Sequence, residues 1–389
     1  MSRLTVFIWV FALAACGAPP TPGSHDGGDV RTDGGLDLND VSFLFPLPAS
    51  PALESQLLGL DALLSPALYA GLPVIIEGRD AGELYTALRV VSARIDPCFP
   101  TTAPPAPAAC AKQLRLVAQP LALDSALGLT TEDATVHLFY DLSPQQFDAA
   151  MRTVLELRAQ AGGLTDGQPL DIHPVMRAQG LSGAYAQKLK AMISAHCTSQ
   201  TLVRIAFMHV AATGSAWRFG AFDVVAGQLV AAKIPRTPDL TVQGVQEFGS
   251  TEFRSGQLVP AASGDQLPVL LSESSMRLTD EKTLQKALKS ALTIENPERS
   301  TPQTIDCASC HVASRARTNA ERRRMVDTTG YDEAYLAPAR FDVRRVDAVG
   351  EDPKALRAFG YVGGRGAWSQ RTVNESAAIA EALSRSGPR

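Results

Sequence analysis

The chain has 389 residues, of which 45% are hydrophobic and 20% are charged, a size that suits two or three folded units with packed cores. Its 36 Lys and Arg residues nearly balance 40 Asp and Glu residues, which leaves a formal net charge of -4. This balance argues against a nucleic-acid partner. The six cysteines are too few for a disulfide-rich miniprotein, but their uneven spacing is informative.

The N-terminus has the pattern of an export signal. Arg3 precedes an uncharged stretch over residues 4–12, and small residues then lead to Cys16. The apolar part is too short to stay across a bilayer. The segment resembles a bacterial lipoprotein signal, and this resemblance implies a signal peptide over residues 1–15, lipidation of Cys16, and anchoring in the cell envelope, at the outer membrane facing the periplasm. The alternative is an incidental cysteine in a plain signal peptide or an uncleaved anchor.

Residues 16–40 are rich in glycine and carry five Asp against one Arg. Such a composition buries little apolar surface, so we expect a disordered tether. The spacing of the aspartates does not fit the alternating ligand pattern of a calcium loop.

Residues 41–277 predict an α+β domain with an antiparallel sheet. Runs rich in β-branched and aromatic residues, bounded by turn residues, occur at 90–95, 113–118, 134–140, 202–210, 217–225 and 229–234. The last three follow one another closely and predict a meander. One helix is expected after the capping pattern at Ser143, and another from Ser182 to His196. The domain contains no recognisable catalytic motif, which leaves a binding surface or a spacer.

Cys98 and Cys110 enclose a proline-rich loop that suits no regular element. In an oxidising exported compartment we expect them to form one disulfide. Cys197 is then left over as a buried free thiol, although an exchange with either loop cysteine stays open.

The sequence Cys307-Ala-Ser-Cys310-His311 has C-x-x-C-H spacing. A helical turn with this spacing presents two thiols together and brings the following histidine beneath them. Asp306 is placed to cap that helix. The motif resembles the haem-attachment site of c-type cytochromes, which implies one covalent haem c on Cys307 and Cys310 with His311 as the proximal iron ligand. A disulfide between the two cysteines, or a zinc site completed by His196 or Cys197, are the alternatives.

Residues 278–389 are expected to form the small all-α domain that the cytochrome resemblance implies. One helix opens at residues 279–281 and ends at Asn296-Pro297, a short one starts at Asp352-Pro353 and closes at Gly360, and a last one follows Trp368-Ser369. Their order around the motif is similar to that of a monohaem class I cytochrome c.

The second axial ligand is not evident from the sequence. The family resemblance implies a methionine some tens of residues after the motif, but Met325 comes early and neither Met nor His follows it. The candidates are Met325 or Met276, a side chain of the middle domain such as His209 or Met208, or an empty sixth position. Five arginines near the motif suit an acidic redox partner, the haem propionates or a solvated helix face: Arg315, Arg317, Arg322, Arg323 and Arg324.

These patterns together predict a lipid-anchored periplasmic monohaem cytochrome that passes electrons to or from a partner protein of unknown identity. An exported binding or scaffold lipoprotein without a redox role is one alternative, and a haem enzyme of the peroxidase type is another. An electron carrier is favoured over an enzyme because no catalytic group is recognisable outside the haem motif.

Overall fold

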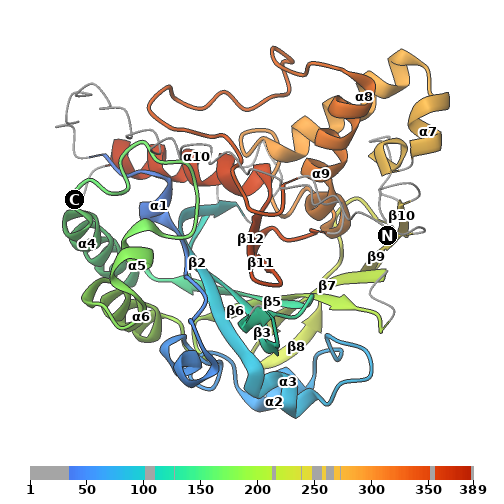
Figure 1. The fold of residues 1–389 in the computed structure, drawn as a ribbon. Helices are drawn as coiled ribbons and strands as arrows, with labels where there is room; N and C mark the ends of the chain where they lie inside the picture. Colours follow the sequence, from blue (N-terminus) through green and yellow to red (C-terminus); the bar gives the residue numbers. More distant parts are fainter. Residues whose placement is uncertain are drawn as a thin grey trace, which may run out of the picture. The chain divides into compact units, whose positions relative to one another are not determined.

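A ten-stranded sheet lies at the centre of the computed structural model, in which every pair of strands is antiparallel (Figure 1). The structure describes residues 35–386 apart from 101–109, 127, 213–215, 238, 248–255, 260–266, 272 and 351–354. The predicted signal peptide, Cys16 and most of the tether lie outside these residues. The strand order is β1-β2-β3-β5-β6-β7-β9-β10, with β4 beside β3 and β8 beside β7.

The strands of this sheet are β1 (Ser42–Leu44), β2 (Leu88–Pro100), β3 (Cys110–Asp124), β4 (Gly128–Thr131), β5 (Thr135–Leu142), β6 (Leu202–Val210), β7 (Ala216–Val225), β8 (Gln228–Ala231), β9 (Val242–Glu247) and β10 (Gly256–Val259). A separate hairpin pairs β11 (Phe359–Val362) with β12 (Arg365–Trp368). The α-helices are α1 (Leu38–Val41), α2 (Pro66–Ala70), α3 (Ala81–Ala87), α4 (Pro144–Ala161), α5 (Pro174–Gln179), α6 (Ala184–His196), α7 (Glu273–Leu278), α8 (Glu281–Glu295), α9 (Cys307–Arg324) and α10 (Gln370–Ser386), with short 3-10 helices at Pro51–Gln56 and Leu267–Leu271.

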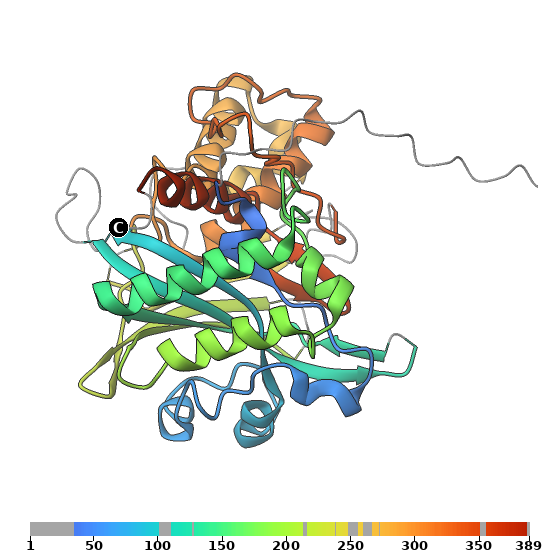
Figure 2. The ribbon, with the colours of Figure 1, turned by 90° about the vertical axis from the view of Figure 1, so that its left-hand side faces the viewer.

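Helices cover both faces of the sheet. Figure 2 shows α4, α5 and α6 along one side, while the hairpin and helices α8 to α10 lie on the other. Strand β5 illustrates why: Val136, Leu138 and Tyr140 are fully buried, whereas the alternate residues His137 and Phe139 are half-buried. A strand with this alternation presents an apolar surface to one layer and a mixed surface to the other.

The predicted mixed α+β architecture with an antiparallel sheet is confirmed, as is the meander of β6, β7 and β8. Helix α4 starts at the predicted capping box of Ser143, whose hydroxyl accepts from the Gln146 amide. It ends at Gly162, which adopts a left-handed φ of 58°. Helices α6, α8 and α10 also lie where the sequence placed them.

The short helix predicted to close at Gly360 is wrong in its described part. Residues 355–358 form no helix, and Phe359 and Gly360 belong to the β11–β12 hairpin, while the predicted start at 352–353 lies outside the described residues. Val362 pairs with Arg365, so Gly363 and Gly364 form a two-residue turn, with Gly363 at a φ of 59°. Two glycines between alternating apolar residues are a hairpin signal.

The end of the predicted tether is also ordered. Leu36 and Leu38 are buried, and so are the two aspartates Asp37 and Asp40. Asp40 accepts hydrogen bonds from the Asp37 amide and the Thr165 hydroxyl, while Arg158 pairs with both carboxylates. The composition of this segment predicted that its aspartates would be exposed to solvent. Instead, residues from distant parts of the chain pair with their carboxylates.

The chain from Gly35 onward clusters into one compact unit. The hairpin is bound to the sheet through Gln119 of β3, whose side chain accepts from the Tyr361 amide at 2.7 Å and donates to the Tyr361 carbonyl at 2.9 Å. Gly360 permits this approach, since a Cβ there would lie 2.4 Å from Gln119 Oε1.

Replacing Gln119 should therefore weaken the attachment of the hairpin. In Gln119→Leu the Tyr361 amide loses its buried acceptor, whereas the Tyr361 carbonyl keeps Arg357 Nε as a donor at 3.1 Å. We expect the free energy of unfolding to fall by about 2 kcal/mol. Urea denaturation measures this loss, with Gln145→Leu on the exposed surface of α4 as the control. Equal stabilities of the two variants would contradict the assigned role.

Candidate functional site

Helix α9 begins at the C-x-x-C-H motif, and its first turn is hydrogen-bonded to the sheet. The predicted N-cap Asp306 accepts from the Ser309 amide at 3.0 Å. Gln243 of β9 donates to the same Asp306 oxygen at 2.7 Å and accepts from the Ala308 amide at 2.8 Å. All these groups are buried, so the motif has a fixed position on strand β9.

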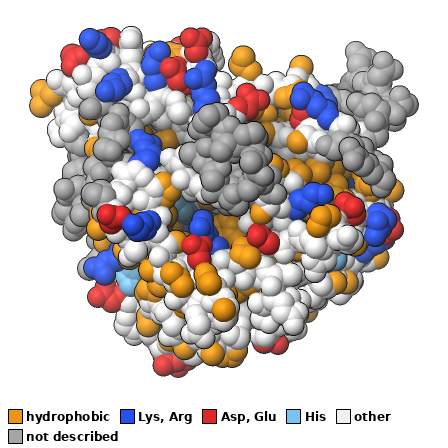
Figure 3. Space-filling view, turned by 180° about the vertical axis from the view of Figure 1, so that it is seen from behind, with side chains coloured by type: hydrophobic (Ala, Val, Ile, Leu, Met, Phe, Trp, Pro, Cys, Tyr) orange, Lys and Arg blue, Asp and Glu red, His pale blue; other side chains and the backbone are white. Residues whose placement is uncertain are grey.

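The motif lines a cavity of about 290 Å³ between the sheet and the C-terminal helices. Cys307, Cys310 and His311 contribute to one wall, and residues of β2, β3, β5, β6 and β7 form the facing wall. Much of the lining is apolar, including the rings of Phe139 and Phe219. On the back of the molecule, hydrophobic side chains gather around a hollow between charged residues (Figure 3). The three motif side chains thus share one largely apolar chamber.

His311 has the environment of a metal-binding histidine. Its Nδ1 lies 2.7 Å from the Leu356 carbonyl, which can only accept, so Nδ1 carries the proton and Nε2 keeps its lone pair. Phe219 packs on the ring with centroids 4.5 Å apart. Burial lowers the pKa of His311 to about 4. The imidazole is therefore neutral at physiological pH, which is the form that binds iron.

Cys307 and Cys310 are free thiols. Burial raises the pKa of Cys307 to about 12 and that of Cys310 to about 11. Redox-active C-x-x-C pairs instead have lowered pKa values, so a dithiol-disulfide function is disfavoured. The zinc alternative also lacks support, because neither His196 nor Cys197 lines the cavity, and no metal-binding cluster of three or more ligands occurs in the described part of the chain.

A second histidine faces the motif from the sheet. His137 of β5 lies with its ring centroid 6.1 Å from that of His311, at an interplanar angle of 79°. Burial lowers its pKa to about 3, which keeps this imidazole neutral as well. No sequence motif marks His137. The sequence feature that could have indicated His137 is the alternating burial pattern of β5, which places it on the face opposite Val136 and Leu138.

Buried charges form another part of the cavity wall. Arg94 pairs with Glu375 at 2.5 Å, Arg115 with Asp96 at 2.7 Å, and Arg371 with Glu375 at 2.7 Å. Although burial opposes ionisation, Arg371 and Arg94 hold the pKa of Glu375 well below its usual range. Three guanidinium groups and two carboxylates thus lie together beside the cavity.

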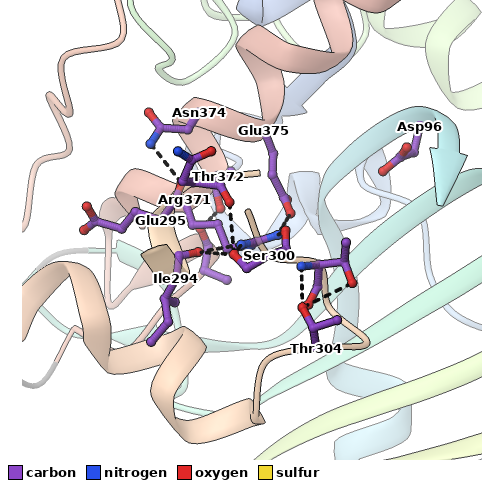
Figure 4. Close-up of polar contacts among 12 residues, drawn as sticks. Asp96, Ile294, Glu295, Ser300, Thr304, Arg371, Thr372, Asn374 and Glu375 are labelled. Carbon is purple, nitrogen blue, oxygen red and sulfur yellow. Dashed lines mark hydrogen bonds and ion pairs between the residues drawn. The ribbon is translucent and has the colours of Figure 1, made fainter. Parts of the chain in front are cut away.

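Figure 4 shows how α10 positions Arg371 within this cluster. The guanidinium donates to the Ser300 hydroxyl at 2.7 Å and to the Ser300 carbonyl at 3.0 Å, in addition to its pair with Glu375. Ser300 precedes the motif helix. Arg371 therefore joins α10 to the segment that leads into the motif, and its charge stays close to the cavity.

Neither methionine proposed as a distal ligand lies at the cavity. Met325 ends α9 in a left-handed conformation and is 88% exposed, because the long helix carries it away from His311. Met276 is 1% exposed within the hydrophobic core and is not a lining residue. Met208 accepts a hydrogen bond from Arg357 at 3.0 Å. His209 is also absent from the lining, and its Nδ1 lies 2.6 Å from the Val74 carbonyl.

The arginines that follow the motif do not line the cavity either. Arg315 forms a buried ion pair with Asp347, and Arg317 pairs with Glu295 and Glu321. These contacts hold α9 to its neighbours. The cationic lining residues come from β2, β3, β6 and α10 and from Lys233 after β8. Their distance from the motif in the sequence gave no indication of this.

The remaining cysteines lie elsewhere. Cys98 is disulfide-bonded, and the strand ends are close, since Pro100 pairs with Cys110 in the β2–β3 register. The side chain of Cys110 lies outside the described side chains, so its pairing with Cys98 stays a prediction. Cys197 is a buried free thiol, as predicted.

Comparisons with protein-family models, curated proteins and solved structures returned no match. Within the described ranges, no helix combines the length and hydropathy required to cross a membrane.

The cap of α9 gives a test of how the motif is held. Asp306→Ala removes the N-cap and leaves the Gln243 amide without its buried acceptor, so we expect the free energy of unfolding to fall by about 2 kcal/mol. Thermal denaturation measures the change. Asp280→Ala, which removes the exposed N-cap of α8, is the matched control. It should lower the free energy of unfolding by a smaller amount. A larger loss in the control would show that the Gln243 contact contributes little.

Proposed function

We propose that this protein is a monohaem c-type cytochrome that acts in electron transfer and is held in the cell envelope by a lipid on Cys16. One observation carries the haem assignment: the two thiols and the imidazole of the motif line a single buried cavity from the start of one helix. The donor set suits haem c, which requires two reduced cysteines and a neutral histidine.

In this proposal Cys307 and Cys310 hold the haem through thioether bonds, and His311 is the proximal ligand. The Leu356 carbonyl fixes the ring orientation and makes Nε2 the ligating atom. When bound, the haem supplies reversible one-electron chemistry. The protein excludes water with apolar walls that include Phe139 and Phe219. Limited access of water to the iron site is one means of setting its reduction potential.

The charge cluster suits the carboxylate groups of a haem. Arg94, Arg115 and Arg371 all line the cavity, and their guanidinium groups pair with Asp96 and Glu375. Arg94 Nε has no hydrogen-bond partner in the described structure although it is buried. Guanidinium groups bind carboxylates with charge-assisted hydrogen bonds, so an anionic group at this wall would stabilise the cluster.

The cytochrome-like unit over residues 278–389 would differ from a self-contained class I domain. Helices α8, α9 and α10 follow the expected order, but the β11–β12 hairpin lies between the last two. The wall that faces the motif comes from the sheet. We therefore propose that the α+β part is a structural component of the haem site as well as a surface for the redox partner.

The haem assignment predicts specific losses. Wild-type protein produced with a functioning haem-attachment system should carry one covalent haem, and Cys307→Ala or Cys310→Ala should lose one thioether bond and most of the bound haem. Intact mass and the alkaline pyridine spectrum measure both effects. Cys197→Ala, at a buried thiol remote from the cavity, is the control and should keep the haem. Absence of covalent haem from the wild type would favour the scaffold lipoprotein.

The anchor is tested separately by detergent phase partitioning. The wild type should enter the detergent phase, and Cys16→Ala should stay in the aqueous phase or keep its uncut signal, because attachment of the lipid requires the thiol. Aqueous partitioning of processed wild-type protein would argue against a lipoprotein. The haem measurements do not depend on this result.

A further inference from the structure

The cavity contains few side chains that could ligate a metal opposite His311. Apart from the motif, the described lining residues offer His137, Lys233 and Glu375. Lys233 is mostly exposed and pairs with Asp239 at 2.5 Å. Glu375 is held between Arg94 and Arg371. Of these three lining side chains, His137 is therefore the one that forms no ion pair in the described structure.

We propose that His137 is the second axial ligand of the iron, so that two histidines from opposite walls of the cavity hold it. This inference rests on the proposed haem function. A metal–imidazole bond is about 2 Å long and a ring nitrogen lies about 1 Å from the ring centre, so two imidazoles on one metal have centroids roughly 6 Å apart. The centroids of His137 and His311 are 6.1 Å apart.

The polar contacts of His137 are consistent with a ligand role. In the described structure its ring nitrogens have no hydrogen-bond partner, and the ring borders the cavity. Buried polar atoms usually have hydrogen-bond partners, and the core histidine His173 pairs one ring nitrogen, Nε2, with the Tyr185 hydroxyl at 2.9 Å. His137 and His311 line the same cavity, and a metal bound there would satisfy one ring nitrogen of His137.

The sheet holds His137 firmly in this position. Strand β5 lies inside the sheet and pairs with β3 and β6, which place Val117 and Ala206 on either side of His137. Ala206 pairs in turn with Ala221 of β7. These small side chains leave space above the strands, while main-chain hydrogen bonds on both sides restrict movement of β5. Such a rigid support suits a ligand that must keep one geometry.

Two-histidine ligation has a spectroscopic signature. The oxidised wild type should be low-spin without the charge-transfer band of a methionine ligand. His137→Ala should keep its covalent haem but become high-spin, and added imidazole should restore the low-spin spectrum. His137→Met should stay low-spin, gain the methionine band and have a raised reduction potential, because a thioether ligand favours the reduced iron.

His209→Ala is the matched control, since His209 lies on the neighbouring strand β6 but outside the cavity lining, and its spectrum should equal that of the wild type. Paramagnetic resonance and near-infrared spectra give the ligand assignment, and intact mass gives the haem content. If the wild type holds no covalent haem, the proposed function fails. If haem is bound and His137→Ala leaves the low-spin spectrum unchanged, only the assignment of His137 is overturned.

Discussion

The side chain of Gln243 makes two buried hydrogen bonds to the start of helix α9, and the position of the motif depends on this contact. An amide can donate and accept at once, so one residue of β9 satisfies both Asp306 and the free Ala308 amide of the first turn. The helix therefore starts at a defined point on the sheet. The same contact determines which strands face Cys307, Cys310 and His311 across the cavity.

The buried arginines impose a second constraint. Removing a guanidinium group from water is costly, and it is tolerated only with charged or hydrogen-bonding partners. Arg371 has Ser300 and Glu375, and Arg94 shares Glu375. Arg115 pairs with Asp96 in the same cluster. These buried charges thus have charged or hydrogen-bonding partners at the wall of the cavity.

Much of the local structure could be predicted from the sequence, because local signals specify it. The cap at Ser143, the cap at Asp306 and the alternating strands depend on residues within a few positions of one another. The chemical content of the motif was equally local, since its spacing alone brings two thiols and an imidazole together. The hairpin turn at Gly363 was also a local signal, but a competing pattern obscured it.

The facing wall of the cavity could not be predicted in this way. His137 lies close to His311 because β5 is an inner strand of the sheet, between β3 and β6. Strands β4 and β8 are not part of this main strand order. The arginines beside the motif in the sequence form ion pairs elsewhere, while those at the cavity come from distant strands. The buried aspartates before α1 likewise depend on Arg158, far along the chain. Pairings of this kind are set by tertiary packing, which composition and periodicity do not encode.

The last helix packs on the N-terminal segment of the described residues. Ser42 and Ser376 share a hydrogen bond at 2.6 Å, and the Leu36 amide donates to the Ser384 hydroxyl at 3.1 Å. The core at Leu36 and Leu38 is therefore complete only after α10 has been synthesised and has closed on it. Such long-range closure slows folding. A chain whose core closes this late stays vulnerable to proteolysis until the final helix is in place.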